Sequence, residues 1–297
     1  MSVRIAVACV LLTAACAPQQ LDAQQASVEA AGKEWAQRCA DWDEWDKPAP
    51  PFQIYGNAWY VGTCGISAIL IAGDDGHVLI DGGPANAANV IAANIEALGF
   101  KLSDVKLLLH SHEHHDHVGG LAELQRLTGA RLLASSAAAA ALTSGTAGAD
   151  DPQFEEHGNF PATRVDVTIQ DREPVRLGHL TLTPIATPGH TPGALSWQWQ
   201  ACARGGCHTV VYADSLTPVS SDGYRFGDHP ETVAAFRASL ARVGALGCSI
   251  LLTPHPSASG MRDRLLEGDL TDTNACRDYA ESLAKRLDER LAKETDG

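Results

Sequence analysis

The spacing of hydrophobic residues changes several times along the first half of this chain, and each change predicts a new element. Short apolar runs bounded by Gly, Pro and Asp predict β-strands. Apolar residues at helical spacing, such as Val90, Ile91 and Ile95, predict a helix. The sequence Gly-Asp-Asp-Gly at 73–76 predicts a hairpin turn. We expect strands over residues 54–61, 67–72, 77–80 and 105–109, and helices over 85–98 and 119–127.

The second half repeats this order of strands before helices. Residues 143–163 are rich in Thr, Gly, Asp and Pro without a clear period, so we expect a long surface loop of the kind that often forms the wall of a binding site. Strands before helices in both halves predict two packed sheets with helices outside. The strands are expected over 164–170, 180–185, 194–200, 209–213 and 249–252, and the helices over 231–243 and from about residue 274.

The first residues predict an export signal. Arg4 precedes an apolar run over 5–15, and Ala15-Cys16-Ala17 matches a small-residue cleavage site. The run has about half of the roughly 20 residues that a membrane-spanning helix needs. We therefore expect residues 1–17 to be removed and the protein to reach the periplasm without a membrane span. Cys16 could instead carry a lipid anchor, although Thr13 replaces the usual leucine.

Composition is that of a globular protein that does not bind polyanions. The chain has 297 residues, 45% of them hydrophobic, which is ample for a buried core. Its formal net charge of −14 repels polyanions, and the sequence shows nothing like the basic stripe that nucleic-acid binders carry. Residues 18–48 are polar and then rich in Trp and Asp, so we expect an N-terminal arm there and one domain over 49–297.

The cysteines predict disulfide bonds. The chain has 8 cysteines, and removal of Cys9 and Cys16 with the leader leaves six, which in an oxidising compartment suggest three disulfides among many possible pairings. Cys202 and Cys207 bracket Ala-Arg-Gly-Gly, a natural hairpin turn, and are expected to pair. A cysteine-rich zinc site is the alternative, but no Cys-x-x-Cys spacing supports it.

The densest chemical signal follows the expected strand over 105–109. The sequence His-Glu-His-His-Asp-His at 112–117 contains four histidines and two acids. Two imidazoles at positions i and i+2 leave a strand on the same side, and the following Asp116 and His117 can face a second point. A solvated polar loop would not need so many imidazoles together, so the segment predicts a metal site.

Two further histidines lie far along the chain in similar settings. His190 lies in the sequence Thr-Pro-Gly-His-Thr-Pro-Gly after one predicted strand, and His255 lies in Leu-Thr-Pro-His-Pro after another. Rigid turns at strand ends hold ligands with little loss of freedom. Together with the cluster at 112–117, both are candidate metal ligands.

The pattern His112-x-His114-x-Asp116-His117, followed by His190 and His255, resembles the signature of the metallo-β-lactamase superfamily. The resemblance covers roughly residues 50–297 and implies an αββα four-layer sandwich, an α/β fold with two mixed sheets flanked by helices. It implies two Zn²⁺ ions per chain, one held by His112, His114 and His190 and the other by Asp116, His117 and His255. It also assigns to Asp81 the role of supporting the ligands.

Within the superfamily, the chain looks like subclass B3. The segment 210–216 has no cysteine where other lactamase subclasses place a zinc ligand, and Asp-Ser-Leu-Thr at 214–217 is similar to a phrase of that subclass. The resemblance implies a disulfide Cys248–Cys276 and allows Cys39–Cys64 as an extra one.

The resemblance implies a hydrolase, a metallo-β-lactamase. A metal-bound hydroxide would attack the amide bond of a β-lactam antibiotic (penicillin, cephalosporin or carbapenem) and so confer resistance. Asp116 would orient the nucleophile as the catalytic residue, and Ser215 and Thr217 would bind the substrate carboxylate. The expected partner is this small molecule alone, and the protein is expected to be a monomer.

Three alternatives stay open at this point. An exported hydrolase of the same fold could act on a lactone, thioester or sulfate ester, and a bridging Asp214 would favour that branch. An iron oxygenase could use the same ligands. A metal-storage protein is the third, although storage does not need six ligands at fixed strand ends.

Overall fold

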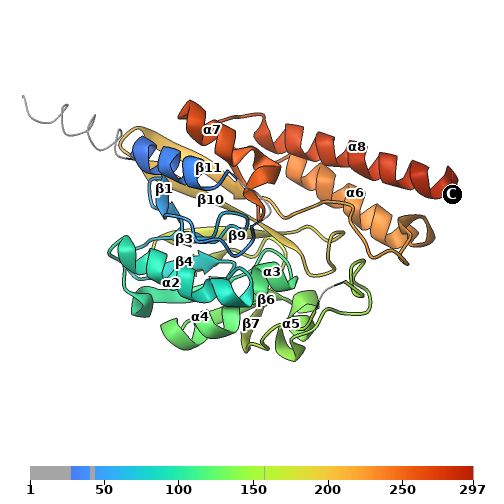
Figure 1. The fold of residues 1–297 in the computed structure, drawn as a ribbon, viewed down its shortest axis with the longest axis horizontal. Coiled ribbons are helices and arrows are strands. Elements are labelled where there is room, and N and C mark those ends of the chain that lie inside the picture. Colours follow the sequence, from blue (N-terminus) through green and yellow to red (C-terminus); the bar gives the residue numbers. More distant parts are fainter. Residues whose placement is uncertain (1–27, 41–43, 157, 297) are drawn as a thin grey trace, which may run out of the picture.

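The computed structural model describes residues 28–40, 44–156 and 158–296 (Figure 1). The predicted leader, with its cleavage site and Cys16, lies outside the described residues. Two sheets form the centre of the molecule, and helices cover the outer face of each.

The first sheet has seven strands in the order β1-β2-β3-β4-β5-β6-β7. Strands β1 to β4 pair antiparallel, and β4 to β7 pair parallel through helical connections, as the short turns and the intervening helices require. The strands are β1 (Phe52–Tyr55), β2 (Ala58–Tyr60), β3 (Ile69–Ile71), β4 (His77–Ile80), β5 (Val105–Leu109), β6 (Arg131–Ser135) and β7 (Val165–Ile169).

The second sheet has five strands in the order β12-β11-β10-β9-β8. All its pairs are antiparallel except the parallel pair of β11 and β12. The strands are β8 (Val175–Leu177), β9 (Leu180–Ala186), β10 (Leu195–Ala203), β11 (Gly206–Tyr212) and β12 (Ile250–Leu252).

The helices form the two outer layers (Figure 1). Helices α2, α4 and α5 cover the first sheet, and α6 and α8 cover the second. The α-helices are α2 (Ala88–Ala97), α3 (His115–Val118), α4 (Leu121–Thr128), α5 (Ser136–Ser144), α6 (Pro230–Gly244), α7 (Met261–Glu267) and α8 (Ala275–Asp296), with a helix over 28–38 before them and short 3₁₀ turns at Ala85–Ala87, Leu102–Asp104, Phe226–Asp228 and Pro256–Ser259.

Strand β5 is mainly apolar, and Lys106 is the one exposed residue among its five. Leu107 and Leu109 pack into the core between the two sheets, whereas Leu108 packs against the helices outside. A strand buried on both faces carries a continuous apolar run instead of an alternating one. The αββα sandwich that the resemblance implies is therefore the observed fold.

The structure differs from the predicted elements in three places. The strand expected over 54–61 is two strands, because the chain turns at Gly56, whose φ is +55°. The segment expected to be a polar arm contains the helix over 28–38, whose Trp35 is fully buried against Phe52 and Tyr60. Strand β8 and helix α7 were not predicted, since both are short and lie in polar sequence.

The structure contains the disulfides Cys39–Cys64, Cys202–Cys207 and Cys248–Cys276. These are the pair expected from the hairpin and the two that the resemblance implies or allows. None of the helices in the described part of the chain combines the length and the apolar character needed to cross a bilayer.

Candidate metal centre

Chain segments that are far apart in sequence meet at one site. His112 and His114 follow β5, and Asp116 and His117 lie in the single turn of α3. His190 lies in the loop between β9 and β10, and His255 follows β12. These residues form two groups of three candidate metal ligands; within each group the ligand atoms all lie within 4.8 Å of one another.

Glycines allow the backbone around α3 to approach the loop after β4. A side chain on Gly120 would place its Cβ 2.2 Å from the carbonyl oxygen of Gly82. The amide of Gly82 in turn donates to the carbonyl of His117 at 2.8 Å. Glycine is the residue that permits such contact between backbones. The Gly-Gly pair after the histidine cluster therefore fixes α3 next to Asp81.

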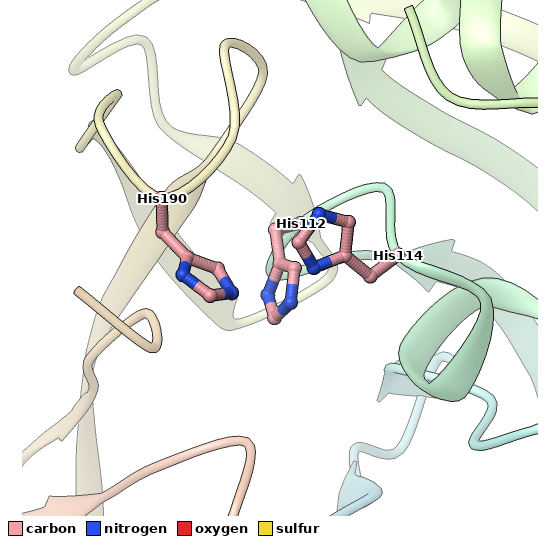
Figure 2. Close-up of side chains that lie close together, drawn as sticks. All are labelled: His112, His114 and His190. Atoms are coloured by element: carbon pink, nitrogen blue, oxygen red, sulfur yellow. The ribbon is translucent and has the colours of Figure 1, made fainter. Parts of the chain in front are cut away.

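The first group consists of His112, His114 and His190 (Figure 2). The three rings lie around one point, with ring centroids 4.8 to 4.9 Å apart. All three side chains are buried, with residue exposures of 0%, 2% and 6%. Three imidazoles at this spacing match the ligand set of a catalytic zinc site, which keeps a further position open.

In each of these three rings, one nitrogen makes a contact that fixes the orientation of the ring. His114 Nε2 donates to Asp151 Oδ2 at 2.9 Å, and His190 Nδ1 donates to the carbonyl oxygen of Thr217 at 2.9 Å. His112 Nδ1 lies 2.9 Å from Asp214 Oδ1. Contacts of this kind fix the ring and the tautomer, so that the other nitrogen can bind a metal.

The remaining nitrogen of His112 supports this interpretation. His112 Nε2 is buried and has no hydrogen-bond partner among the described residues. A buried polar atom without a partner is costly, and a metal ligand is one way to satisfy it. The group thus offers Nε2 of His112 and of His190 and Nδ1 of His114 to a cation; His190 Nε2 also lies 3.5 Å from Gln153 Nε2.

Burial keeps these histidines neutral. It lowers the pKa of His190 to about 3 and that of His112 well below the usual value, and it lowers the pKa of His255 to about 4. Neutral imidazole is the form that binds metal ions. His112, His190 and His255 are therefore in the metal-binding form at neutral pH, whereas the carboxylate of Asp116 raises the pKa of His117.

The second group consists of Asp116, His117 and His255. Asp116 Oδ2 lies 3.0 Å from His117 Nε2 and 3.4 Å from His255 Nε2, and these two nitrogens are 3.3 Å apart. A carboxylate and two imidazoles that converge in this way suit a second divalent cation. The two groups are adjacent, because the rings of His112 and His117 have centroids 4.2 Å apart.

Asp81 lies beneath both groups. Its Oδ1 accepts from the amide of Ser111 at 2.6 Å, and its Oδ2 accepts from the hydroxyls of Ser111 and Tyr212, both at 2.7 Å. His117 Nδ1 lies 3.9 Å away. Asp81 also has a φ of +65°, which is rare for a residue with a side chain and persists where surrounding contacts fix it. Asp81 therefore lies where it can support the ligand loop.

Of the two candidate substrate residues, Thr217 lies beside His190. Ser215 is 3% exposed, and its hydroxyl has no hydrogen-bond partner in the part of the chain that the structure describes. Thr217 Oγ1 lies 3.3 Å from His190 Nδ1. On another side of the site, the indole of Trp45 is 5.6 Å from the ring of His255 and is 39% exposed.

Sequence reasoning missed two contacts of the site, those made by Asp151 and Tyr212. Asp151 comes from the loop over 143–163, and its bond to His114 joins residues 37 positions apart, which no local pattern could indicate. Tyr212 was part of a predicted strand with no assigned role. Asp214, which the sequence leaves open as a metal bridge, belongs to neither group of candidate ligands among the described residues.

The model of the metallo-beta-lactamase superfamily matches residues 61–202. Among curated proteins, a hydroxyacylglutathione hydrolase of Anaeromyxobacter dehalogenans is 29% identical over 213 residues, which are 67% of this chain and 69% of that protein. Another from Rhodopseudomonas palustris is 35% identical over 37% of this chain and 34% of its own length.

Solved structures resemble the chain over more of its length. The MIM-2 metallo-beta-lactamase is 58% identical, with a TM-score of 0.86 over 89% of this chain and 98% of that one. MIM-1 from Novosphingobium pentaromativorans is 48% identical, with the same TM-score and coverage. MEM-A1, a subclass B3 metallo-beta-lactamase from a soil metagenome library, is 42% identical, with a TM-score of 0.82 over 85% of this chain and 99% of that one. The chain therefore belongs to the metallo-β-lactamase superfamily, and within it resembles the subclass B3 metallo-β-lactamases.

Proposed function

We propose that this protein is a hydrolase that opens the amide bond of β-lactam antibiotics with the help of two zinc ions. The observation that carries the proposal is the pair of adjacent three-residue groups at one site, in a chain 58% identical to a metallo-β-lactamase over almost all of that enzyme. The fold alone would not identify the substrate, because many chemistries share one fold.

The donor set fits zinc. Neutral imidazoles and a carboxylate are ligands that zinc accepts, and the ring contacts described above aim one nitrogen of each histidine in the first group at a common point. Bound zinc would lower the pKa of water to about 7 and polarise the lactam carbonyl, which supplies a nucleophile at neutral pH.

Asp116 would orient the nucleophile. Its Oδ2 lies within 3.4 Å of both His117 and His255, so its carboxylate is held within the second group. A carboxylate fixed there can accept a hydrogen bond from the attacking water and hold that proton close to the amide nitrogen that departs. Its position, held by two imidazoles, needs little rearrangement during the reaction.

Ser215 and Thr217 would bind the carboxylate of the substrate. The hydroxyl of Ser215 is buried without a partner in the described chain, so a substrate oxygen could accept its proton in a hydrogen bond. The net charge of −14 does not oppose an anionic substrate, because two zinc ions would add four positive charges at the site itself.

The location proposed for this reaction is the periplasm, where activity would confer antibiotic resistance. Three disulfides support an oxidising compartment, since such bonds are rare in the cytosol.

Rates on competing substrates test the proposal. The purified protein would be given a chromogenic cephalosporin, a carbapenem, a hydroxyacylglutathione thioester and a lactone, with the His190→Ala variant as the control for contaminating enzymes. We expect kcat/KM of about 10⁴ M⁻¹ s⁻¹ or more on a β-lactam, within the usual range of enzymes, and far lower values on the thioester and the lactone. Faster hydrolysis of the thioester or lactone would replace the lactam assignment.

A further inference from the structure

Glu113 is a buried carboxylate without a role in the reaction described so far. It stands between His112 and His114 in the sequence, and it is only 3% exposed. Burial of a carboxylate is costly unless hydrogen bonds compensate for the lost water. An apolar side chain could fill the same space without that cost, so the contacts of Glu113 need an explanation.

Both carboxylate oxygens of Glu113 bind the loop that carries His190. Oε2 accepts from the hydroxyl of Thr191 at 2.7 Å, and Oε1 accepts from the backbone amide of Gly193 at 2.7 Å. These two donors stand one and three positions after His190. A single side chain therefore joins the loop of the first two imidazoles to the loop of the third.

Neighbouring hydrogen bonds also join the same two loops, but they do not replace the two that Glu113 accepts. The amide of Leu195 donates to the carbonyl of Ser111 at 2.6 Å, and Ser135 Oγ donates to the carbonyl of Gly193 at 2.7 Å. The first of these bonds lies at the base of the His190 loop, where β10 begins. The second comes from Ser135 at the end of β6, outside the two loops. Among these contacts, only Glu113 reaches Thr191, the residue next to the candidate ligand.

A metal site needs its ligand-bearing loops to be held at fixed relative positions. Ligand distances must be met to within about 0.2 Å, and groups that orient the ligands strongly influence affinity. His112 and His114 are set by β5 and α3, whereas His190 comes from a separate loop between β9 and β10. The relative position of the two loops therefore decides whether three nitrogens can bind one ion.

We propose that Glu113 is a positioning residue of the metal centre, which holds the His190 loop against the His112 and His114 loop so that the three imidazoles close on one metal ion. The inference rests on the proposed metal binding at these histidines. It assigns to Glu113 no contact with metal or substrate.

Metal titration of two variants tests this role. Glu113→Gln keeps the shape and both contacts, because its amide oxygen can accept from Gly193 and its amide nitrogen can donate to Thr191. Glu113→Leu removes both. Metal-free protein would be titrated with zinc against a chromogenic chelator, and with cobalt(II), whose visible absorption reports coordination. We expect Glu113→Leu to lose about 10- to 100-fold in affinity for one of two metal ions and to change the cobalt spectrum, and Glu113→Gln to retain both properties.

A buried polar residue elsewhere provides the matched control. Asn94 Nδ2 donates to the carbonyl oxygens of Ala49, Val61 and Gly62, none of which belongs to either ligand group. Asn94→Leu should lower the melting temperature without changing metal affinity or the cobalt spectrum. Wild-type affinity and an unchanged spectrum in Glu113→Leu, even with a lower melting temperature, would overturn the positioning role.

A milder variant covers the case in which Glu113→Leu does not fold. Thr191→Val keeps the shape of the side chain and removes one of the two hydrogen bonds, and we expect a smaller loss of affinity at the same metal ion. Unchanged affinity in this variant would also count against the inference. Wild-type protein that binds no metal at all would overturn the metal centre itself, and the inference with it.

Discussion

At the scale of single residues, the centre is defined as much by what holds the histidines as by the histidines themselves. The bond from His114 to Asp151 and the bond from His190 to the Thr217 carbonyl each fix one ring, and Asp214 lies against His112. A ring fixed in this way loses little freedom when it binds a metal. Changes to the ligands and changes to the residues that hold them should therefore have separable effects.

Removal of a ligand should abolish the reaction without unfolding the protein. His190 lies in a loop, and its ring contributes to the site and not to the three hydrophobic cores. We expect His190→Ala to reduce β-lactam hydrolysis to the background rate, with the disulfide content of the wild type and a melting temperature close to that of the metal-free wild type. Near-normal turnover would remove His190 from the set of ligands.

Removal of a ring contact should weaken the centre without abolishing it. Asp151→Asn keeps the size of the side chain but replaces the charged acceptor for His114 Nε2. We expect about 10- to 100-fold lower zinc affinity or kcat/KM, measured by chelator competition and by steady-state kinetics. Full activity at limiting zinc would show that the Asp151 charge does not matter.

At the scale of elements, the sequence predicts the parts that have a strong period and misses those that depend on partners far away. The predicted bounds of strand β5 agree with the observed ones, because Val105 and the three leucines 107–109 form a mainly apolar segment in which Lys106 is the one exposed residue. The helix over 28–38 was missed, since its sequence is mostly polar and its burial comes from Trp35, Ala36 and Cys39 meeting the sheet. The ligand histidines stood out in the sequence, but Asp151 and Glu113 acquire their roles only through loops brought together by the fold.

The missed helix leads to a stability prediction. Trp35 is fully buried and packs edge-on against Tyr60 with ring centroids 5.3 Å apart. Trp35→Ala should lower the free energy of unfolding by about 3 to 5 kcal/mol, since a large aromatic leaves a cavity. Denaturant unfolding with the disulfides intact measures this. A loss below about 1 kcal/mol would mean that the helix is not part of the core.

At the scale of the whole molecule, the two sheets bring the candidate ligands together. Four candidate ligands follow strand β5 of the first sheet, whereas His190 and His255 follow strands of the second sheet. The four are His112, His114, Asp116 and His117. Each group of three therefore combines residues from both sheets, and metal binding would join the two halves. Ligands that bind only the folded state stabilise it, so removal of the metals should lower the melting temperature as well as the activity.

The most direct test of the account is hydrolysis of a chromogenic cephalosporin by purified protein with its bound metals counted, after removal of the metals by a chelator, and after addition of zinc. The account predicts that the protein holds two zinc ions per chain. It also predicts that turnover is lost when the chelator removes the metals and returns when zinc is added. Turnover by protein shown to be free of metal, or no turnover by protein that holds two zinc ions, would contradict it.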